Sequence, residues 1–354
     1  MTAPSLDAQP IDLAALQSRV DTALHDFLDA KTRSAKDQCL PLDVSAALRD
    51  FLTAGGKRLR PLLCVLGWHA VGGQDDDTAV VRTAAALEMF HAFCLIHDDI
   101  MDNSATRRGR PTVHRSIAVR HGHDRLGTSA AILIGDMALA WSDELLHSAG
   151  HPPHRLAGLR RVIDVMRQEV IYGQYLDLMT PLGPITDHEA ALQVIRFKTA
   201  KYTVERPLHC GAILADADPD LTAALSRYAL PLGEAFQLRD DLLGVYGRPD
   251  DTGKPVLDDL REGKQTVLLA LAAQRANTAQ RKLLDTLVGT ADLDLDGAAR
   301  IRAVLDTTGA HATVEDMIAT RYAQALTALD AVPYPKPAAA ALRHLAARAV
   351  ERTS

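Results

Sequence analysis

The sequence predicts an all-α protein, and two observations support this fold class. Alanine and leucine recur along the whole chain and apolar residues fall at helical spacing in stretch after stretch, whereas aromatic residues make up only 4% of the sequence. Of the 354 residues, 47% are hydrophobic and 24% are charged, which is typical of a globular protein rather than a disordered chain or a membrane protein. We therefore expect a single domain over residues 1–354, with residues 1–12 flexible.

Clusters of turn residues divide the chain into helical segments. Glycine, proline and aspartate, which end helices or form turns, gather between apolar segments. These clusters lie at residues 72–73, 150–153, 181–184, 216–219, 247–253 and 332–337. None is long enough to be a flexible interdomain linker, and no repeat of fixed period is present. The pattern predicts ten or more helices in one domain.

The segment 83–97 is apolar around almost its whole circumference, which is typical of a helix in the middle of a bundle. It continues into HDDIMDNSATRRGRPT at residues 97–112, where three carboxylates precede two arginines. Asp98 and Asp102 are four residues apart, so both project from one face of a continuing helix while Asp99 points elsewhere. Such a carboxylate pair, together with substrate phosphate oxygens, is a typical way to hold Mg²⁺.

A second apolar helix is predicted to deliver another acidic pair. The segment GEAFQLRDDLLG at residues 233–244 ends in Asp240, Asp241 and the two leucines before Gly244. Either acidic cluster alone is weak evidence, because acidic runs are usually solvated helix ends. If the two helices face each other across a cavity, however, their carboxylates can hold several Mg²⁺ ions that clamp a diphosphate.

Positive residues occur in short groups at turns or helix ends. These groups are GGKRLRP at 55–61, Arg107 with Arg108, KTAK at 198–201, and two GK pairs that end at Lys254 and Lys264. Compact groups suit a small polyanion, whereas nucleic acid requires an extended track of cations. The net charge of −6 also gives no general attraction for nucleic acid or an anionic membrane.

A further polar pair, Gln174 and Asp177, stands three residues apart on another apolar helix. The pair could support a metal site indirectly or cap a buried helix contact.

The cysteines and the N-terminus indicate the compartment. The four cysteines are scattered and form no CxxC pair, so we expect buried free thiols rather than disulfides or zinc sites. The N-terminal segment MTAPSLDAQPIDL lacks a basic stretch followed by an apolar core, and no uncharged apolar run reaches membrane-spanning length. These features predict a cytoplasmic protein with no stable membrane insertion and no nucleic-acid partner.

Together these motifs resemble the trans-isoprenyl diphosphate synthases, or polyprenyl synthetases, and among them the geranylgeranyl diphosphate synthases. The resemblance runs from residue 55 to about 266 and rests on GGKRLRP, DDIMDNSATRRGRPT, GQYLD, KTA, FQLRDD and the two GK pairs. It implies a bundle of mostly antiparallel helices around a deep central cavity, a homodimer, and three Mg²⁺ ions bound with an allylic diphosphate. It also implies condensation of isopentenyl diphosphate with dimethylallyl, geranyl or farnesyl diphosphate by ionisation, condensation and proton elimination, with release of diphosphate.

The resemblance assigns roles residue by residue. The implied metal ligands are Asp98, Asp102 and Asp240, supported by Asp99 and Asp241. The implied clamp on the allylic diphosphate consists of Arg107, Lys198 and Lys254, with Thr199, Gln237 and Lys264 nearby. The implied pocket for isopentenyl diphosphate consists of Lys57, Arg60, His91 and Arg108. The catalytic set is Asp98, Asp102, Arg107, Lys198, Asp240 and Lys254.

One position departs from the family pattern. The fifth position of the second acidic motif, normally Asp, is Gly244. We expect Asp240 to carry more of the coordination there, so that Asp240 is indispensable and Gly244 is tolerated.

Two residues before the first acidic motif bear on product length. Phe93 and Cys94 lie five and four residues before Asp98, about one helical turn deeper along the same wall. A bulky ring there would block a lengthening chain, whereas the smaller Cys94 leaves some room. This pattern favours geranylgeranyl diphosphate as the product, with farnesyl diphosphate as the alternative. A lone aromatic on an apolar helix can also be simply part of the core.

Three other functions remain open from the sequence. A class I terpene cyclase also pairs a DDxxD helix with Mg²⁺, but FQLRDD stands where its Asn, Ser and Glu motif would be. An HD-type phosphohydrolase could use His97 and Asp98 with His69 and His91, but that reading leaves Asp102 and the second cluster without a role. A non-enzymatic regulatory subunit would be expected to have a degraded acidic motif, and only Gly244 indicates this.

Overall fold

The computed structural model describes residues 10–73, 78–182, 186–247 and 257–351, and it is almost entirely helical. The first half of the chain contains α1 (Leu13–Asp37), α2 (Asp43–Thr53), α3 (Leu59–Ala70), α4 (Thr78–Met101), α5 (Val113–His121), α6 (Asp124–His147), α7 (Pro153–Met179) and the short 3₁₀ turn η1 (Thr180–Leu182). The second half contains α8 (His188–Val194), the π-helix η2 (Ile195–Glu205), α9 (Arg206–Leu214), α10 (Pro219–Tyr246), α12 (Asp258–Arg261), α13 (Val267–Arg275), α14 (Thr278–Leu287), α15 (Leu295–Thr307), α16 (Ala310–Asp330) and α17 (Lys336–Val350). The predicted all-α class is confirmed.

Helix boundaries lie where the turn residues predicted them. The helix α7 begins at Pro153, and α10 begins at Pro219, where the missing backbone donor of proline costs nothing. The side chain of Asp218 caps α10 by accepting a hydrogen bond from the backbone of Leu221 at 2.7 Å. The described strands are the two-residue pair β1 (Thr106–Arg107) and β2 (Arg110–Pro111), which form a tight hairpin after α4.

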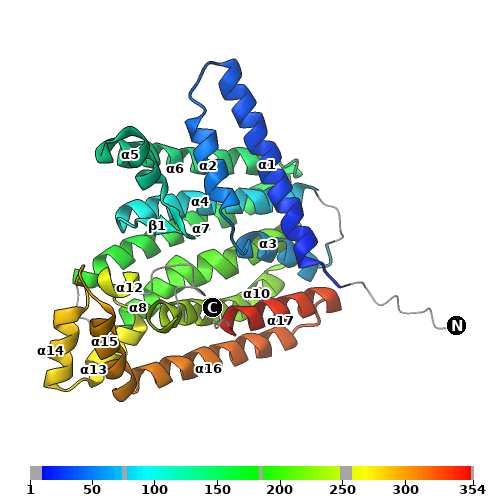
Figure 1. Ribbon diagram of the computed structural model, residues 1–354. Coiled ribbons are helices and arrows are strands. Elements are labelled where there is room, and N and C mark those ends of the chain that lie inside the picture. The colour runs from blue at the N-terminus through cyan, green and yellow to red at the C-terminus, as the bar shows by residue number, and fades with distance from the viewer. Residues whose placement is uncertain (1–9, 74–77, 183–185, 248–256, 352–354) are drawn as a thin grey trace.

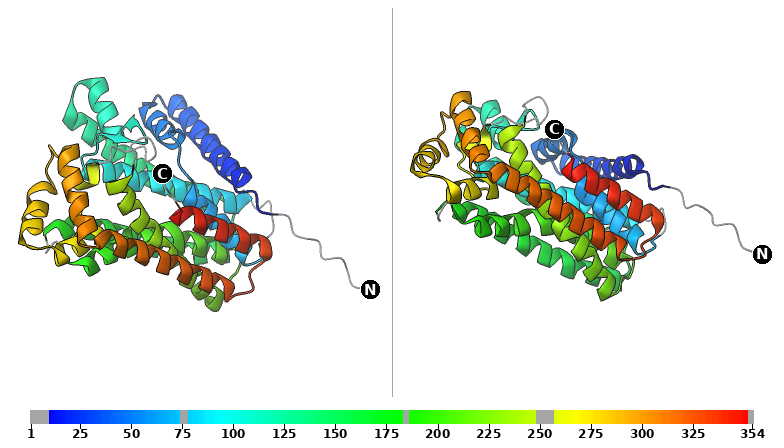
Figure 2. Two further views of the ribbon diagram at one scale, coloured as in Figure 1. Left: turned by 60° about the horizontal axis from the view of Figure 1, so that its bottom comes forward. Right: turned by 90° about the horizontal axis from the view of Figure 1, so that it is seen from below.

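The long helices pack side by side as a bundle (Figure 1). The helix α6 packs on α4, η2 packs against both α7 and α10, and α16 packs on α10. In Figure 1, α1 and α2 lie at one side of the bundle, at a steep angle to α4, and α13 to α15 gather at one end of it. Figure 2 shows the same grouping from two further directions.

The core consists of two apolar clusters that share one helix. Leu225, Tyr228 and Leu232 of α10 belong to the cluster that includes α1 to α7. Further along the same helix, Leu238 and Leu242 belong to the cluster that includes α13 to α16. The acidic end of α10 is therefore anchored by the second cluster, next to the first.

The helix α4 is buried as the sequence predicted. Among the described helices, only α4 is long and apolar enough to cross a membrane, and 67% of its most apolar window is buried inside the fold. Such burial is typical of the core helix of a bundle. The predicted cytoplasmic location stays a prediction.

The thiols follow the expectation only in part. All four cysteines are free, and Cys64 and Cys210 are buried. Cys94 is half-buried, whereas Cys39 is exposed because it lies in the turn after α1. The expectation of four buried thiols was therefore wrong for Cys39.

Candidate active site

The C-terminal end of α4 places its three carboxylates in different environments. Asp99 is 1% exposed, and both of its oxygens accept hydrogen bonds from Nε of Arg107, at 2.8 and 2.9 Å. Asp98 lies on another face, with its Oδ2 3.3 Å from Nη2 of the same arginine. Because the β1–β2 hairpin turns the chain back on α4, Arg107 reaches both residues. The charge cluster at the end of α4 is thus largely buried rather than exposed.

Lys198 of η2 joins the first cluster to α7. Its Nζ donates to Oδ1 of Asp98 at 3.0 Å and to Oδ2 of Asp177 at 2.6 Å. Burial disfavours the charged form of Asp98, but Lys198 and Arg107 outweigh burial and hold the pKa of Asp98 below its usual range. Asp177, for which the sequence left open an indirect role at a metal site or a cap of a helix contact, is therefore a direct member of the cluster.

The backbone of η2 comes close to its neighbours through two glycines. A Cβ added at Gly173 of α7 would lie 2.3 Å from the backbone nitrogen of Lys198. A Cβ added at Gly233 of α10 would lie 2.5 Å from the Cα of Ala200. Glycine at both positions lets the π-helix pack against α7 and α10 at once, and this contact sets the place of the Lys198 side chain.

The second cluster is held by a chain of hydrogen bonds from η2 to α10. Thr199 donates to Oε1 of Gln237 at 2.8 Å, and Nε2 of Gln237 donates to Oδ1 of Asp241 at 2.8 Å. Asp241 is 5% exposed, and burial raises its pKa to about 7 although Lys264 and Gln237 act in the opposite direction. Asp240, on the neighbouring face of α10, is half-buried.

Lys264 connects the two acidic clusters. It is one of the residues around a cavity of about 40 Å³, which is also lined by Asp177, Lys198, Thr199, Gln237 and Asp241. Burial disfavours its charge, but Asp259, Asp177, Asp241 and Asp98 outweigh burial and raise the pKa of Lys264. Asp98 belongs to α4 and Asp241 belongs to α10. The ammonium group of Lys264 therefore interacts electrostatically with both predicted acidic helix ends.

The donor set of this site fits Mg²⁺. Burial, and next the neighbouring Asp98, raise the pKa of Asp102 to about 6, so a bound cation would favour the charged form of this carboxyl. In the part of the chain that the structure describes, no three His, Cys, Asp or Glu side chains gather into a preformed metal cage. Mg²⁺ is usually bound by one or two carboxylates together with waters and substrate phosphates, so an open set of carboxylates suits it.

The histidines do not form the alternative metal centre of an HD-type hydrolase. His69 is bonded to a backbone carbonyl at 3.0 Å, and Nδ1 of His97 lies 3.1 Å from another backbone carbonyl. His91 instead contacts the hydroxyl of Tyr202 at 3.0 Å. The three rings thus serve separate local contacts.

A second group of cations surrounds His91. Nη2 of Arg60 donates to the hydroxyl of Thr203 at 2.6 Å, and its guanidinium lies 4.2 Å above the ring of Tyr202. The buried Nε of Arg60 has no hydrogen-bond partner among the described residues. Burial, with Arg60 and Arg108 next in effect, lowers the pKa of His91 well below its usual value, so the ring is neutral at pH 7.

The other two members of the predicted pocket, Arg108 and Lys57, differ in their surroundings. Arg108 donates to the backbone carbonyl of Gly55 and so joins the hairpin to the GGKRLRP segment. Lys57 is exposed and lines a cavity of about 310 Å³ together with Phe236 and Arg348. The structure therefore brings Arg60, His91 and Arg108 together, whereas Lys57 is exposed and lines a different cavity.

Arg58, between the two predicted binding residues of the same segment, has a structural role. Its guanidinium donates to Asp21 at 2.7 Å, to Glu88 at 2.9 Å and to the carbonyl of Leu52 at 2.7 Å, and the residue is 6% exposed. These contacts hold the loop before α3 against α1 and α4, which positions Lys57 and Arg60.

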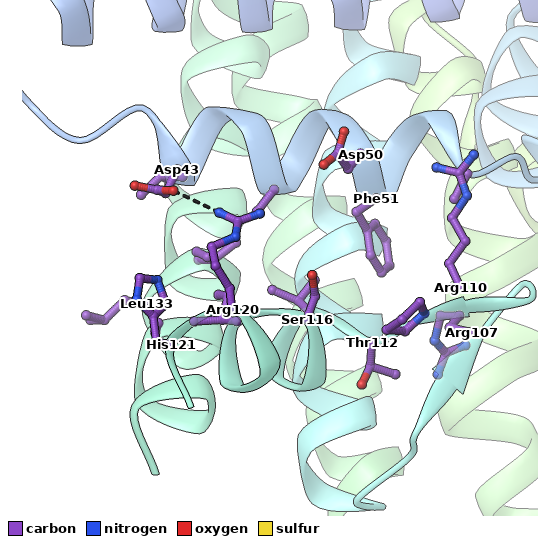
Figure 3. Close-up of a pocket in the computed structure, with 18 of the residues that line it drawn as sticks. Asp43, Asp50, Phe51, Arg107, Arg110, Thr112, Ser116, Arg120, His121 and Leu133 are labelled. Atoms are coloured by element: carbon purple, nitrogen blue, oxygen red, sulfur yellow. Dashed lines mark hydrogen bonds and ion pairs between the residues drawn. The ribbon is translucent and has the colours of Figure 1, made fainter. Parts of the chain in front are cut away.

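A separate cavity of about 620 Å³ lies between α2, α5 and α6 (Figure 3). Arg107 and Arg110 of the hairpin stand at one end, and Arg120 bonds Asp43 across the other end at 3.0 Å. None of the acidic residues of α4 or α10 lines this cavity. It shares only the hairpin with the acidic site.

The predicted chain-length residues lie on the wall of α4. The ring of Phe93 packs against Phe90 at 5.3 Å and against His97 at 4.8 Å between ring centres. Phe93 and Cys94 are both half-buried, and both pack against the first core cluster. Their effect on product length stays a prediction.

Some functional contacts were not visible in the sequence, and one predicted residue cannot be placed. Tyr202 and Thr203, the partners of His91 and Arg60, carry no motif that would have identified them. Asp259, which acts on Lys264, lies in the segment DDLREGK, where an acidic run before the GK pair looks like a solvated helix end. Lys254 lies outside the described residues.

Comparisons with known proteins agree with these findings. The Polyprenyl synthetase family model matches residues 43–305. A geranylgeranyl diphosphate synthase from Saccharolobus solfataricus is 35% identical over 255 residues, which cover 70% of this chain and 73% of that protein. A (2E,6E)-farnesyl diphosphate synthase from Mycobacterium tuberculosis is 32% identical over 300 residues, which cover 84% of this chain and 80% of that protein.

Comparison with solved structures finds similarity to the same kind of protein. A crystal structure of geranylgeranyl pyrophosphate synthase from Corynebacterium glutamicum, complexed with isoprenyl diphosphate and magnesium, matches with a TM-score of 0.92 at 42% identity. The match covers 97% of this chain and 100% of that chain. Sequence and fold are thus similar to the same group of proteins.

Proposed function

Because the chain belongs to the polyprenyl synthetase family, we propose that its acidic site ionises an allylic diphosphate and that its product is geranylgeranyl diphosphate. The chain is a trans-prenyl diphosphate synthase, and its substrates are isopentenyl and allylic diphosphates. The observation that carries the proposal is geometric: Lys198 bonds Asp98 of α4 at 3.0 Å, and it lines one small cavity together with Asp241 of α10 and Lys264.

The allylic diphosphate is proposed to bind between α4 and α10. Arg107 and Lys198 would donate hydrogen bonds to its oxygens, because charge-assisted contacts of this kind stabilise a leaving anion most strongly. Bound Mg²⁺, three ions in this proposal, would stabilise the negative charge that accumulates on the departing diphosphate. Asp98, Asp102 and Asp240 would hold these ions, and a homologous synthase is known in complex with magnesium.

Binding of this substrate requires Lys198 to change partners. In the present structure Lys198 is paired with Asp98 and Asp177. When a diphosphate arrives, Asp177 can keep its contact to the ammonium group while Asp98 is released to the metal. The contacts of Lys198 with Asp98 and Asp177 thus place its ammonium group where the substrate is proposed to bind.

Isopentenyl diphosphate is proposed to bind in the cluster of Arg60, His91 and Arg108, with Lys57 as a further contact. The neutral ring of His91 can hydrogen-bond to the diphosphate without adding charge, and the buried Nε of Arg60 offers a donor that no group in the described part of the chain uses. The double bond of this substrate attacks the allylic cation, a new carbon–carbon bond forms, and a proton then leaves to the released diphosphate. The chain needs no side-chain nucleophile for these steps.

Phe93 is proposed to set the length of the product. Its ring occupies the wall of α4 about one turn below Asp98, where the tail of a growing chain would pass. A geranylgeranyl chain is the proposed limit, and farnesyl diphosphate, the product of the mycobacterial relative, is the alternative.

The protein is further proposed to act as a homodimer. The outer faces of α6 and α7 expose many large apolar side chains, more than isolated surface residues account for. They are Ile132 and Met137 on α6, and Val165, Ile171, Tyr172, Tyr175, Leu178 and Met179 on α7. A second copy of the chain, packed by two-fold symmetry, would cover the same face on both molecules.

The experiment is product analysis with purified protein and Mg²⁺. The protein should convert labelled isopentenyl diphosphate to geranylgeranyl diphosphate with dimethylallyl, geranyl or farnesyl diphosphate as the starter. When a starter is supplied without isopentenyl diphosphate, no hydrocarbon or alcohol product should form. A C15 product would move the proposal to the farnesyl alternative. A hydrocarbon or alcohol formed from the starter alone would indicate a terpene cyclase, and no turnover would indicate a regulatory subunit.

A further inference from the structure

We propose that the cavity between α2, α5 and α6 is a second binding site, separate from the acidic site, for the prenyl diphosphate that the enzyme makes. The inference rests on the proposed function for the identity of its ligand. It goes beyond that function because none of the acidic residues of α4 or α10 lines this cavity. The site holds an apolar tail between the three helices and a diphosphate on the β1–β2 hairpin.

The walls of the cavity are apolar. Its volume of about 620 Å³ lies in the range of small-molecule binding sites. Leu126 and Leu133 of α6 are 46% and 67% exposed there, and Phe51 points into the space from α2 (Figure 3). Ile117 of α5 also lines it. Because a hydrocarbon chain would remove this apolar surface from water, the cavity suits an extended tail.

The hairpin places cations at one end of the cavity. Arg107, Arg108 and Arg110 all line it. Arg110 is exposed, forms no hydrogen bond or ion pair with the described residues, and extends from β2 to the end of α2 (Figure 3). Arginine forks match phosphate oxygens in pairs, so this end suits an anionic head group.

Positive charge exceeds negative charge on the lining, which has four arginines and two aspartates. Asp43 is paired with Arg120 at 3.0 Å at the end opposite the hairpin, and Asp50 is exposed. Burial, and after it the neighbouring arginines, lower the pKa of Arg108 although Glu88 acts in the opposite direction. The hairpin end therefore carries positive charge that an anion would stabilise.

The apolar walls and the cationic end together define the ligand. Inorganic pyrophosphate would leave the walls in water, and a fatty acid would offer one carboxylate to three arginines. A prenyl diphosphate has both a chain and a larger anionic head. In the hairpin, Arg107 is the strand partner of Arg110, and the Arg107 side chain contacts Asp99. Bound product therefore lies against the element that carries Arg107 to the acidic site, which suits feedback on the reaction.

The test is equilibrium dialysis of the protein with labelled geranylgeranyl diphosphate in EDTA, which removes the magnesium that the acidic site is proposed to need. Ala47→Phe fills the cavity from α2, and Ala46→Phe is its control at the exposed neighbouring position. Arg110→Gln removes a charge from the hairpin end, and Arg125→Gln is its control, an exposed charge outside the cavity. Thermal unfolding without ligand checks the fold of each variant.

Wild type should bind the probe in EDTA, and Ala47→Phe and Arg110→Gln should each weaken binding at least tenfold. The two controls should stay within about threefold of wild type. Geranylgeraniol, which lacks the diphosphate, and inorganic pyrophosphate, which lacks the tail, should each bind at least tenfold more weakly than the probe. The inference is overturned by no binding in wild type, by wild-type affinity in either folded variant, or by equal binding of either partial ligand.

Turnover with Mg²⁺ separates this inference from the proposed function. Ala47→Phe and Arg110→Gln should keep initial rates within about threefold of wild type, because neither position belongs to the acidic site. A tenfold loss of rate in both folded variants would mean that the cavity is part of the reaction site and would contradict a separate site. Wild-type protein that binds the probe in EDTA but makes no prenyl diphosphate would overturn the proposed function and not the binding site.

Discussion

Asp98 forms ion pairs with two cations, Lys198 of η2 and Arg107 of the β1–β2 hairpin. Asp98→Asn keeps the size of the side chain but removes the charge that a metal ion requires. We expect kcat to fall at least 100-fold, or about 3 kcal/mol, because one electrostatic contact to a developing charge is worth this much. Incorporation of labelled isopentenyl diphosphate measures the effect. A decrease of less than about threefold in a folded variant would remove Asp98 from the metal ligands.

Phe93 gives a second prediction at this scale. Phe93→Ala opens the wall of α4 below Asp98, so the products should be longer than those of wild type by at least one isoprene unit. Phe93→Tyr keeps the ring and should leave the product length unchanged. Chromatography of the dephosphorylated products measures the chain length that each variant makes. Identical chain lengths in wild type and Phe93→Ala would mean that the ring belongs only to the core.

His209 of α9 predicts a pH dependence of stability. The ring is 5% exposed and is bonded to Ser226 at 2.9 Å, and burial lowers its pKa to about 4. In the unfolded chain it takes up a proton near pH 6.5, so this stabilising contribution is fully present above pH 6.5. It is lost as the pH falls towards 4, at about 1.4 kcal/mol per pH unit.

The comparison with His209→Gln isolates this residue. The variant lacks the titrating group, so the difference in free energy of unfolding between wild type and variant should shrink as the pH falls from 7 to 4.5. Urea unfolding at several pH values measures it. Parallel curves for the two proteins would contradict the assignment.

At the scale of elements, the local pattern predicted α4 and the end of α10 well. Helical spacing alone placed Asp98 and Asp102 on one face and Asp99 on another, and the structure agrees. The π-helix η2 could not be predicted, because it depends on contacts of Gly173 and Gly233 with a segment distant in sequence. The same holds for the space at Gly244, which the Asp259 side chain fills only once α12 is packed beside α10.

The pair α6 and α7 carries the prediction of assembly. Tyr172→Asp combined with Tyr175→Asp puts two charges on the exposed apolar face of α7, where the two rings are 67% and 59% exposed. If a second copy covers this face, the double variant should be monomeric at concentrations where wild type is a dimer. Light scattering during gel filtration gives the mass. Val119→Asp, at an 83% exposed site on α5, is the control. A double variant with wild-type mass would exclude this face as the interface.

At the scale of the whole molecule, two apolar clusters hold the acidic helices at fixed positions. One cluster includes α1 to α7, and therefore α4. The other includes α13 to α16, and α10 belongs to both clusters. The site therefore lies where the two parts of the core meet, and the small cavity lined by Lys198 and Lys264 belongs to this site. Sequence motifs identified most of these residues, whereas their meeting point depends on packing over the full length of the chain.

The most direct measurement is a crystal structure with Mg²⁺, isopentenyl diphosphate and an unreactive thiolo analogue of an allylic diphosphate. The account predicts metal ions between the analogue's diphosphate and the carboxylates of Asp98 and Asp240, with Lys198 turned from Asp98 to the diphosphate. Binding of the analogue in the cavity between α2, α5 and α6, with the acids of α4 and α10 free of metal, would contradict it.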